Sequence, residues 1–302
     1  MSAAGATAKA PAKADLAAPR VAWPTVGLAL AAAATWAGAV VLGATGRLPL
    51  PLAVGLAAAA AFACFTPMHD AAHRSVARAR WLNELVGRLA AVPLTAPFVA
   101  FRYVHLEHHK HTNAPGLDPD LWSGTGPRAL LPLRWLTQDL HYYAVVFAAA
   151  RRRPRAELVE LALALGAQAA VLALCWGQGL LLEAALLGLL PARLAIAALA
   201  WSFDYAPHRP HVTRASDDRF RATHVVGGPW LTLPFLWQNY HLIHHLYPGV
   251  PFYRYARLWR AQRADLLARG ARVVPVVGRV LPLDPAPAPA PAAGPAAGPV
   301  AA

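Results

Sequence analysis

Cysteine and charge are both scarce in this sequence, and each shortage excludes a class of protein. The 302 residues include two cysteines, Cys64 and Cys175. The sequence therefore has no disulfide framework, no CxxC motif and no ferredoxin-type run of cysteines. Charged residues make up only 14% of the chain and hydrophobic residues 57%, which is too apolar for an ordinary soluble domain of this size. The composition indicates an integral membrane protein.

Four apolar segments are each long enough to cross a membrane. They cover residues 21–45, 48–68, 158–176 and 180–201. The first two have no charge, the third has only Glu160, and the fourth has Glu183 and Arg193. A helix of about 20 residues crosses roughly 30 Å of hydrocarbon. We therefore predict an all-α membrane protein with four transmembrane helices in two hairpins.

Lysine and arginine are distributed unevenly, and this predicts an orientation. Arg47 lies between the first two segments and Arg193 inside the fourth, whereas all the others fall in the N-terminal segment, the middle loop and the C-terminal region. The positive-inside rule places these three regions in the cytoplasm, at the inner membrane if the protein is bacterial. The net charge of +13 follows from this rule and from anionic lipid at the same surface, so we expect no nucleic-acid partner.

Composition also divides the chain into three parts. Residues 1–20 are rich in Ala and Lys and are predicted to be disordered, residues 21–280 form one membrane domain, and residues 281–302 form a disordered Pro/Ala-rich tail. Residues 89–101 are uncharged but too few to cross, and their prolines predict a re-entrant or interfacial segment. Residues 129–150 are amphipathic and predicted to be interfacial. We expect such interfacial helices to cap the spans on the cytoplasmic side.

Histidine, in contrast, is concentrated in three short clusters that hold eight of the thirteen histidines. The clusters read H-x-x-x-H at 69–73, H-x-x-H-H at 105–109 and H-x-x-H-H at 241–245. Positions i, i+3 and i+4 share one face of a helix, so each cluster is predicted to aim its imidazoles at one point. Eight imidazoles exceed the four ligands of one zinc ion and suit a pair of iron ions. The predicted metal ligands are His69, His73, His105, His108, His109, His241, His244 and His245.

Two irons held by neutral nitrogen ligands at the membrane surface predict an oxidoreductase. Such a centre would use O2 and two electrons to oxidise an unactivated C–H bond. The substrate is expected to be lipid-soluble, because the centre lies where the bilayer ends. We expect a separate electron donor, such as a ferredoxin or a cytochrome with its reductase, to dock on the basic cytoplasmic face.

Longer strings around the clusters resemble a known family. HDAAH, HLEHH and HLIHH are similar to the histidine boxes of the integral-membrane fatty acid desaturase/hydroxylase superfamily, over residues 45–260. HDAAHRS, HLEHHKHTN, FDYAPHRPH and NYHLIHHLYPGVPFYRY most resemble the desaturase-type β-carotene hydroxylases. The resemblance implies that the eight box histidines bind two irons and that another histidine before the third box joins them. His208 and His211 have the most suitable spacing for that role, and His224 is a further candidate.

Polar side chains near the boxes are candidates for orienting the imidazoles, through the ring N–H that does not face the metal. They are Asp70, Glu107, Asn113, Asp118, Asp120, Asp204 and Asn239. Arg193 would be costly if it faced lipid, so we expect it to turn toward a carboxylate or toward the cytoplasmic surface.

The resemblance implies hydroxylation of a β-carotene ring as the leading activity, with desaturation of an acyl chain, or carotenoid ketolation, as the alternative. Hydroxylation and desaturation diverge after the first hydrogen is removed, and that choice depends on substrate placement. Ile243 stands where many acyl desaturases have Glu, which favours the hydroxylase. A membrane metal transporter is a distant alternative. The spans of a transporter would be expected to carry ionisable residues near the midplane, and the apolar segments of this chain have very few. A zinc hydrolase would need HExxH, which HLEHH does not match.

Overall fold

The computed structural model describes residues 13–281, and its long helices follow the predicted spans. After α1 (Lys13–Leu16), α2 (Trp23–Ala44) and α3 (Leu50–Ala72) form the first hairpin. The second hairpin pairs α8 (Arg155–Gly177) with the composite helix Leu181–Tyr205. All four are long and apolar enough to cross a membrane, which confirms the predicted all-α membrane class. Residues 1–12 and 282–302, parts of the two segments expected to be disordered, lie outside the described residues.

The fourth span changes its helical form along its length. It consists of α9 (Leu181–Glu183), the π-helical η5 (Ala184–Leu189), α10 (Leu190–Leu199) and the π-helical η6 (Ala200–Tyr205). π-helical turns are rare and often occur at functional sites. Here η6 leads directly into the segment that carries His208. Arg193, inside this span, turns to the carboxylate of Asp139 on α7 (Gln138–Ala148), 2.5 Å from Nη1 to Oδ1. This is the first of the two expected outcomes.

The second box lies on a helix that turns back from its predecessor. The helix α4 (Arg80–Ala91) continues into the 3-10 turn η1 (Val92–Leu94), and α5 (Phe98–His111) starts directly after Pro97. The two helices are bent by 100°, as in a broken span or a re-entrant loop. Because proline cannot continue a helix and restricts the residue before it, Pro93 and Pro97 account for the break. This fits the predicted re-entrant or interfacial segment.

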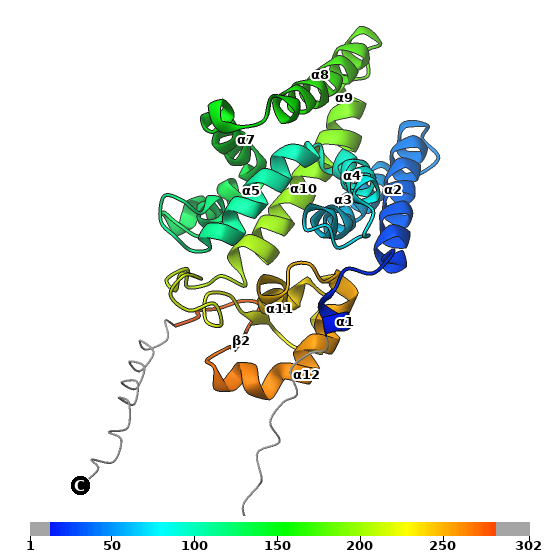
Figure 1. Cartoon of the computed structure of the whole chain (residues 1–302). Helices are drawn as coiled ribbons and strands as arrows, with labels where there is room; N and C mark the ends of the chain where they lie inside the picture. Colours follow the sequence, from blue (N-terminus) through cyan, green and yellow to red (C-terminus); the bar gives the residue numbers. More distant parts are fainter. Residues whose placement is uncertain (1–12, 282–302) are drawn as a thin grey trace, which may run out of the picture.

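Short elements connect α5 to α8. They are η2 (Pro119–Ser123), η3 (Arg128–Leu130), α6 (Leu131–Leu136), α7 (Gln138–Ala148) and η4 (Ala150–Arg152). The helix α7 packs against α5 and against the fourth span. In contrast, α8 projects from the bundle (Figure 1), and few of its residues are buried inside the described chain. A helix with apolar side chains on all sides is suited to lipid contact.

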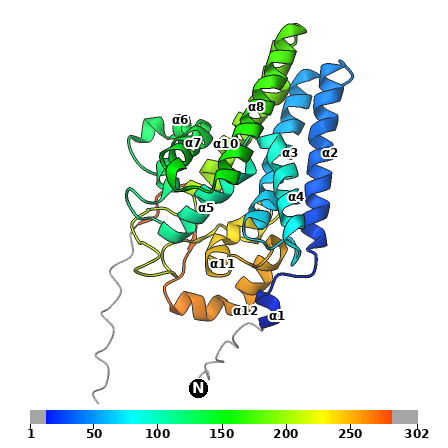
Figure 2. The same ribbon diagram turned by 45° about the horizontal axis from the view of Figure 1, so that its top comes forward.

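The C-terminal part of the described chain forms a cap over one end of the spans. Its elements are β1 (Val225–Val226), η7 (Pro229–Leu231), η8 (Gln238–Tyr240), α11 (His241–Leu246), η9 (Phe252–Arg254), α12 (Tyr255–Ala268) and β2 (Val273–Val274). The strands β1 and β2 pair in parallel. Figures 1 and 2 show α11 between the spans and α12. The third box is therefore held against the ends of α3 and α5.

Asp70 fastens the cap to the first hairpin. Its carboxylate accepts a hydrogen bond from the Thr25 hydroxyl on α2 at 2.8 Å and from the Phe252 backbone N–H at 3.3 Å. Three chain segments that are distant in sequence thus meet at one buried carboxylate. Asp70 contacts no box imidazole through these bonds, so its role is to join the cap to the spans rather than to orient a histidine.

Candidate metal centre

The structure brings the box histidines together, but in two groups rather than three. The five-histidine group contains His69, His73, His105, His109 and His244. The four-histidine group contains His108, His208, His241 and His245. Within each group the ring nitrogens all lie within 4.8 Å of one another. Either set could therefore hold one metal ion.

The second and third boxes are each divided between the two groups, whereas each box was expected to aim at one point. On α5, His105 and His109 join the five-histidine group and His108 joins the other. On α11 the division is reversed, because His244 joins the five-histidine group while His241 and His245 join the other. Residues i and i+4 overlie each other on a helix, and residue i+3 points to one side of them. Each H-x-x-H-H box can thus serve two neighbouring metal ions.

The nitrogens of the five-histidine group are spaced as ligands of a common ion. The Nε2–Nε2 distances are 2.8 Å for His73 and His105, 3.0 Å for His69 and His244, and 2.7 Å for His109 and His244. Imidazole nitrogens bind a first-row metal at about 2.1 Å, so two nitrogens at right angles lie about 3.0 Å apart. These three distances agree with that spacing. The pattern fits convergence on one point better than hydrogen bonding, since His244 Nε2 lies close to two other ring nitrogens.

The four-histidine group shows the same spacing. His241 Nε2 lies 3.0 Å from His208 Nε2 and 3.0 Å from His245 Nε2. His245 Nε2 lies 3.3 Å from His108 Nε2. His208 thus occupies the place expected for the ninth histidine, just after the fourth span.

His211 and His224, the other candidates for the ninth position, lie outside both groups. The ring of His211 is 6.3 Å from that of His208, centroid to centroid. It fills the space beside Gly124, where an added Cβ would lie 2.1 Å from His211 Nε2. His224 Nε2 bonds to the backbone oxygen of Arg209 at 2.9 Å. The structure therefore favours His208 over both.

Burial keeps the cap imidazoles in their neutral form. Desolvation lowers the pKa of His241, His244 and His245 well below the usual range of histidine, and the neighbouring histidines lower each pKa further. Desolvation also lowers the pKa of His208. Metal ions bind the neutral imidazole. These four ligand candidates therefore need not release protons at neutral pH in order to bind a metal.

Two carboxylates orient His108. Its Nδ1 lies 2.8 Å from Asp118 Oδ1 and 3.3 Å from Asp120 Oδ2. Asp118 is fixed in turn by the backbone N–H groups of Asn113 at 2.6 Å and Asp120 at 2.9 Å. A proton on Nδ1, shared with Asp118, leaves Nε2 free to face the metal. The expected orienting role of Asp118 and Asp120 thus has a matching contact.

In the five-histidine group, a tyrosine hydroxyl lies beside the Nδ1 atom of a ligand candidate, as the Asp118 carboxylate lies beside Nδ1 of His108. The Tyr255 hydroxyl lies 3.1 Å from His244 Nδ1, and the side chain is fully buried at the start of α12. Sequence reasoning missed Tyr255, because it follows the third box by ten residues and α12 must fold back to bring it there. The only signal was its place in the string PGVPFYRY, which carries part of the family resemblance.

The remaining orienting candidates lie farther from the imidazoles. Glu107 pairs with Lys110 and with His111, at 3.8 and 3.7 Å, rather than with a box histidine. The Asn113 side chain donates to the carbonyl oxygens of Thr213 and Ala222, and only the backbone N–H of Asn113 bonds to Asp118. The next two candidates bond away from the rings: Asn239 Nδ2 donates to the Val226 oxygen, and Asp204 accepts from the Tyr142 hydroxyl at 3.4 Å.

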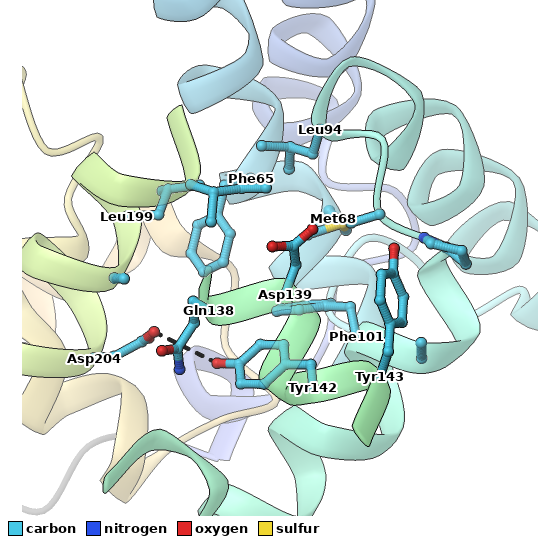
Figure 3. A pocket seen from close by; sticks show the side chains of 15 residues that line it. Phe65, Met68, Leu94, Phe101, Gln138, Asp139, Tyr142, Tyr143, Leu199 and Asp204 are labelled. Carbon is cyan, nitrogen blue, oxygen red and sulfur yellow. Dashed lines mark hydrogen bonds between the residues drawn. The ribbon is translucent and has the colours of Figure 1, made fainter. Parts of the chain in front are cut away.

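An apolar cavity (Figure 3) is linked to the five-histidine group by two of its lining residues. Phe65 and Phe101 line it, and their rings stack on His69 and His105 at centroid distances of 5.5 and 5.2 Å. Other lining residues include Met68, Leu94, Ile196, Leu199, Gln138, Asp139, Tyr142, Tyr143 and Asp204. The cavity offers mainly hydrocarbon surface next to the candidate metal ligands, as a lipid-binding site requires.

This fold and site are those of a membrane protein with two histidine groups that could each hold a metal ion. Residues 45–276 match the family model described as fatty acid desaturase, and the chain therefore belongs to the fatty acid desaturase family. It is 25% identical over 230 residues to the chloroplastic omega-6 fatty acid desaturase of Spinacia oleracea, covering 72% of this chain and 43% of that protein. It is 28% identical over 233 residues to the dihydrorhizobitoxine desaturase of Bradyrhizobium elkanii, covering 67% and 64%.

A shorter match concerns the sn-1 acyl-lipid omega-3 desaturase (ferredoxin) of Nostoc sp., 39% identical over 51 residues, which are 17% of this chain and 14% of that protein. The chain covers less than two thirds of the length of each of these relatives. The superfamily expected from the histidine boxes is confirmed. The finer expectation of a β-carotene hydroxylase, which Ile243 favoured, finds no support here, because these relatives are named as desaturases. The alternative, acyl desaturation, fits better.

Proposed function

We propose that this chain is a di-iron desaturase of fatty acyl chains, with one iron in each histidine group. The observation that carries the proposal is the pairing of two convergent imidazole groups with an apolar cavity beside one of them. Iron bound there would use O2 and two electrons to remove two hydrogens from neighbouring carbons. The nine proposed ligands are His69, His73, His105, His108, His109, His208, His241, His244 and His245.

The residues of the cavity would position the substrate. A chain lying against Phe65 and Phe101 would pass beside the rings of His69 and His105, because each phenyl ring stacks on one of them. Met68 and Leu199 would exclude water from the same wall. Holding reacting groups in a fixed arrangement can contribute several orders of magnitude to rate.

The electron donor is proposed to be a separate protein that carries negative charge. A surface hollow reaches His73 and is lined by Arg74, Arg102 and Arg153, with Glu107 and Glu157 at its sides. Such a hollow gives a donor access to a proposed ligand, and opposite charge would steer its approach. The Nostoc relative is named with ferredoxin, which makes a ferredoxin the first donor to test. The positive-inside rule would place this hollow and both termini in the cytoplasm.

Expression of the full chain in a bacterial host with a ferredoxin and its reductase tests the proposal. We expect new double bonds in the membrane acyl chains of cells with the unaltered protein. The His244→Ala variant should insert normally and make none, since His244 belongs to the five-histidine group. His111→Ala is the matched control, because His111 lies on α5 one turn from the second box but outside both groups.

Expression in a host that accumulates β-carotene distinguishes acyl desaturation from the ring hydroxylation that the sequence analysis expected. Hydroxylated pigment with unchanged membrane lipids would contradict acyl desaturation and support ring hydroxylation instead. Full desaturation by His244→Ala would contradict the proposed metal ligands.

A further inference from the structure

One buried polar side chain faces the apolar cavity without a hydrogen bond. Gln138, the first residue of α7, is 3% exposed, and neither Nε2 nor Oε1 is hydrogen-bonded to any other residue of the described chain. The Gln138 side chain lies close enough to the Tyr142 hydroxyl to oppose the rise that burial causes in its pKa, but the two groups do not reach hydrogen-bond geometry, and the hydroxyl donates to Asp120 at 2.6 Å instead. A buried amide left without partners costs about 1–3 kcal/mol per unpaired group. Nearly all such groups in native proteins are paired, so Gln138 indicates a partner that enters the cavity.

Three of the polar side chains that line the cavity lie together, while Asp139 and Tyr143 lie apart from them. Figure 3 shows Gln138 near Tyr142 and Asp204, while the phenyl ring of Phe65 and the side chain of Leu199 provide hydrocarbon surface. Within residues 13–281, the Asp204 side chain accepts one hydrogen bond, the 3.4 Å contact from the Tyr142 hydroxyl. The other carboxylate in the lining is already bound, because Asp139 pairs with Arg193. A ligand that fills this cavity thus meets an apolar wall and a polar corner.

The polar corner selects the chemistry of the ligand. The Gln138 amide offers two donors and one acceptor, and Asp204 adds acceptor oxygens. A hydroxyl group can both donate and accept, so it matches this set. A carboxylate would face Asp204 without a cation, since Arg193 is occupied by Asp139. A plain hydrocarbon chain would displace water and leave the amide of Gln138 unpaired.

We propose that Gln138 is a specificity-determining residue that selects lipids with a neutral hydroxyl group on the part of the chain that enters the cavity. The inference rests on the proposed function, because it takes this cavity as the substrate site. A site built to bond a substrate hydroxyl can reject the analogue without it by about 10⁴-fold or more. For a corner that water can share, we expect a preference of at least about tenfold.

Binding of two matched probes tests the inference. The purified full chain in detergent is titrated with 1-tetradecanol and with tetradecane, which differ by one hydroxyl group, in competition with a fluorescent fatty acid. We expect the unaltered protein to bind the alcohol at least tenfold more tightly. Gln138→Met keeps the shape of the side chain and removes the amide, so it should lose this preference while binding tetradecane equally well or more tightly. Gln178→Met, at an exposed position after α8, should keep it.

Two results would overturn the inference: equal binding of both probes by the unaltered protein, or an unchanged preference in Gln138→Met. If Gln138→Met does not fold, Gln138→Leu replaces it as the variant without the amide. The comparison of the two probes on the unaltered protein needs no variant. Probe binding requires neither electrons nor turnover. Absence of new double bonds in the expression test, also when the host is supplied with a hydroxylated fatty acid, together with a retained preference for the alcohol, would therefore overturn the proposed function and leave the selectivity of Gln138 intact.

Discussion

In each histidine group, one imidazole is oriented by a hydrogen bond at its Nδ1 atom, but the bonding partner is charged in one group and neutral in the other. In the four-histidine group, His108 is oriented by the carboxylate of Asp118 at 2.8 Å. In the five-histidine group, His244 is oriented by the neutral hydroxyl of Tyr255 at 3.1 Å. Hydrogen bonds with an ionised partner are about twice as strong as neutral ones. The comparison predicts that the four-histidine group depends more on its orienting contact.

The groups also differ in how their ligands are anchored. The helices α3 and α5, with His73 directly after the end of α3, provide four of the five imidazoles of the larger group. Phe65 and Phe101 pack against two of those rings. The four-histidine group takes one ligand, His208, from the irregular segment that follows η6. Helix geometry positions the first set, whereas the second depends on the path of a loop. Removal of the loop ligand is therefore the most direct way to disrupt one group alone.

The largest effect is expected from His208→Ala. Loss of a direct ligand from a group of four should reduce iron from two per chain toward one and lower desaturation by more than about 100-fold, beyond the usual effect of an outer contact. Iron content of the purified protein and lipid analysis of the cells measure this. His211→Ala is the control, because His211 lies three residues away and outside both groups. The assignment of the ninth ligand is wrong if His211→Ala loses iron and His208→Ala keeps it.

A smaller effect is expected from Asp118→Asn. The carboxylate accepts hydrogen bonds on both oxygens, from His108 on Oδ1 and from the Asn113 N–H on Oδ2. The amide oxygen of asparagine can accept only on its own side, and the NH2 group that replaces the other oxygen is a donor, so one of the two bonds is lost. Changes of this kind cost about 10–100-fold in metal affinity or activity. Competition with a chelator should remove one iron more readily than the other. Glu107→Gln, which lies near the second box but pairs with Lys110, should leave both irons in place; equal loss in the two variants would contradict the role of Asp118.

Features set by local periodicity could be predicted from the sequence. The four spans follow from the length of apolar runs, and the eight box histidines from their spacing. Even so, α3 extends to Ala72, past the predicted end at residue 68, because its last turn is buried by protein rather than by lipid. The division of H-x-x-H-H between two groups was also missed. Helical spacing shows that i+3 differs from i and i+4, but not that another group lies on that side.

Features set by the chain path outside helices could not be predicted. His208 and His211 lie at similar distances in sequence from the third box, so spacing could not choose between them. The backbone turns at His211, where φ is +62°, and only His208 joins a histidine group. Asp118 was close enough in sequence to the second box to be a candidate. Tyr255 reaches His244 only because α12 folds back against α11, and the burial of Gln138 beside the cavity depends on how α7 meets the fourth span. Such contacts depend on tertiary packing, which no local pattern specifies.

The smallest effect is expected from Tyr255→Phe, which sharpens the comparison between the groups. The change removes one neutral hydrogen bond from His244 Nδ1 and keeps the ring that packs in the cap. A neutral bond contributes about 0.5–1.5 kcal/mol, so desaturation should fall only about two- to tenfold, with both irons retained without chelator. Tyr253→Phe, two residues earlier, is the control for loss of a hydroxyl in the same turn. A loss for Tyr255→Phe as large as that for Asp118→Asn would show that a neutral partner orients its histidine as strongly as a carboxylate does, and the proposed difference between the two groups would be wrong.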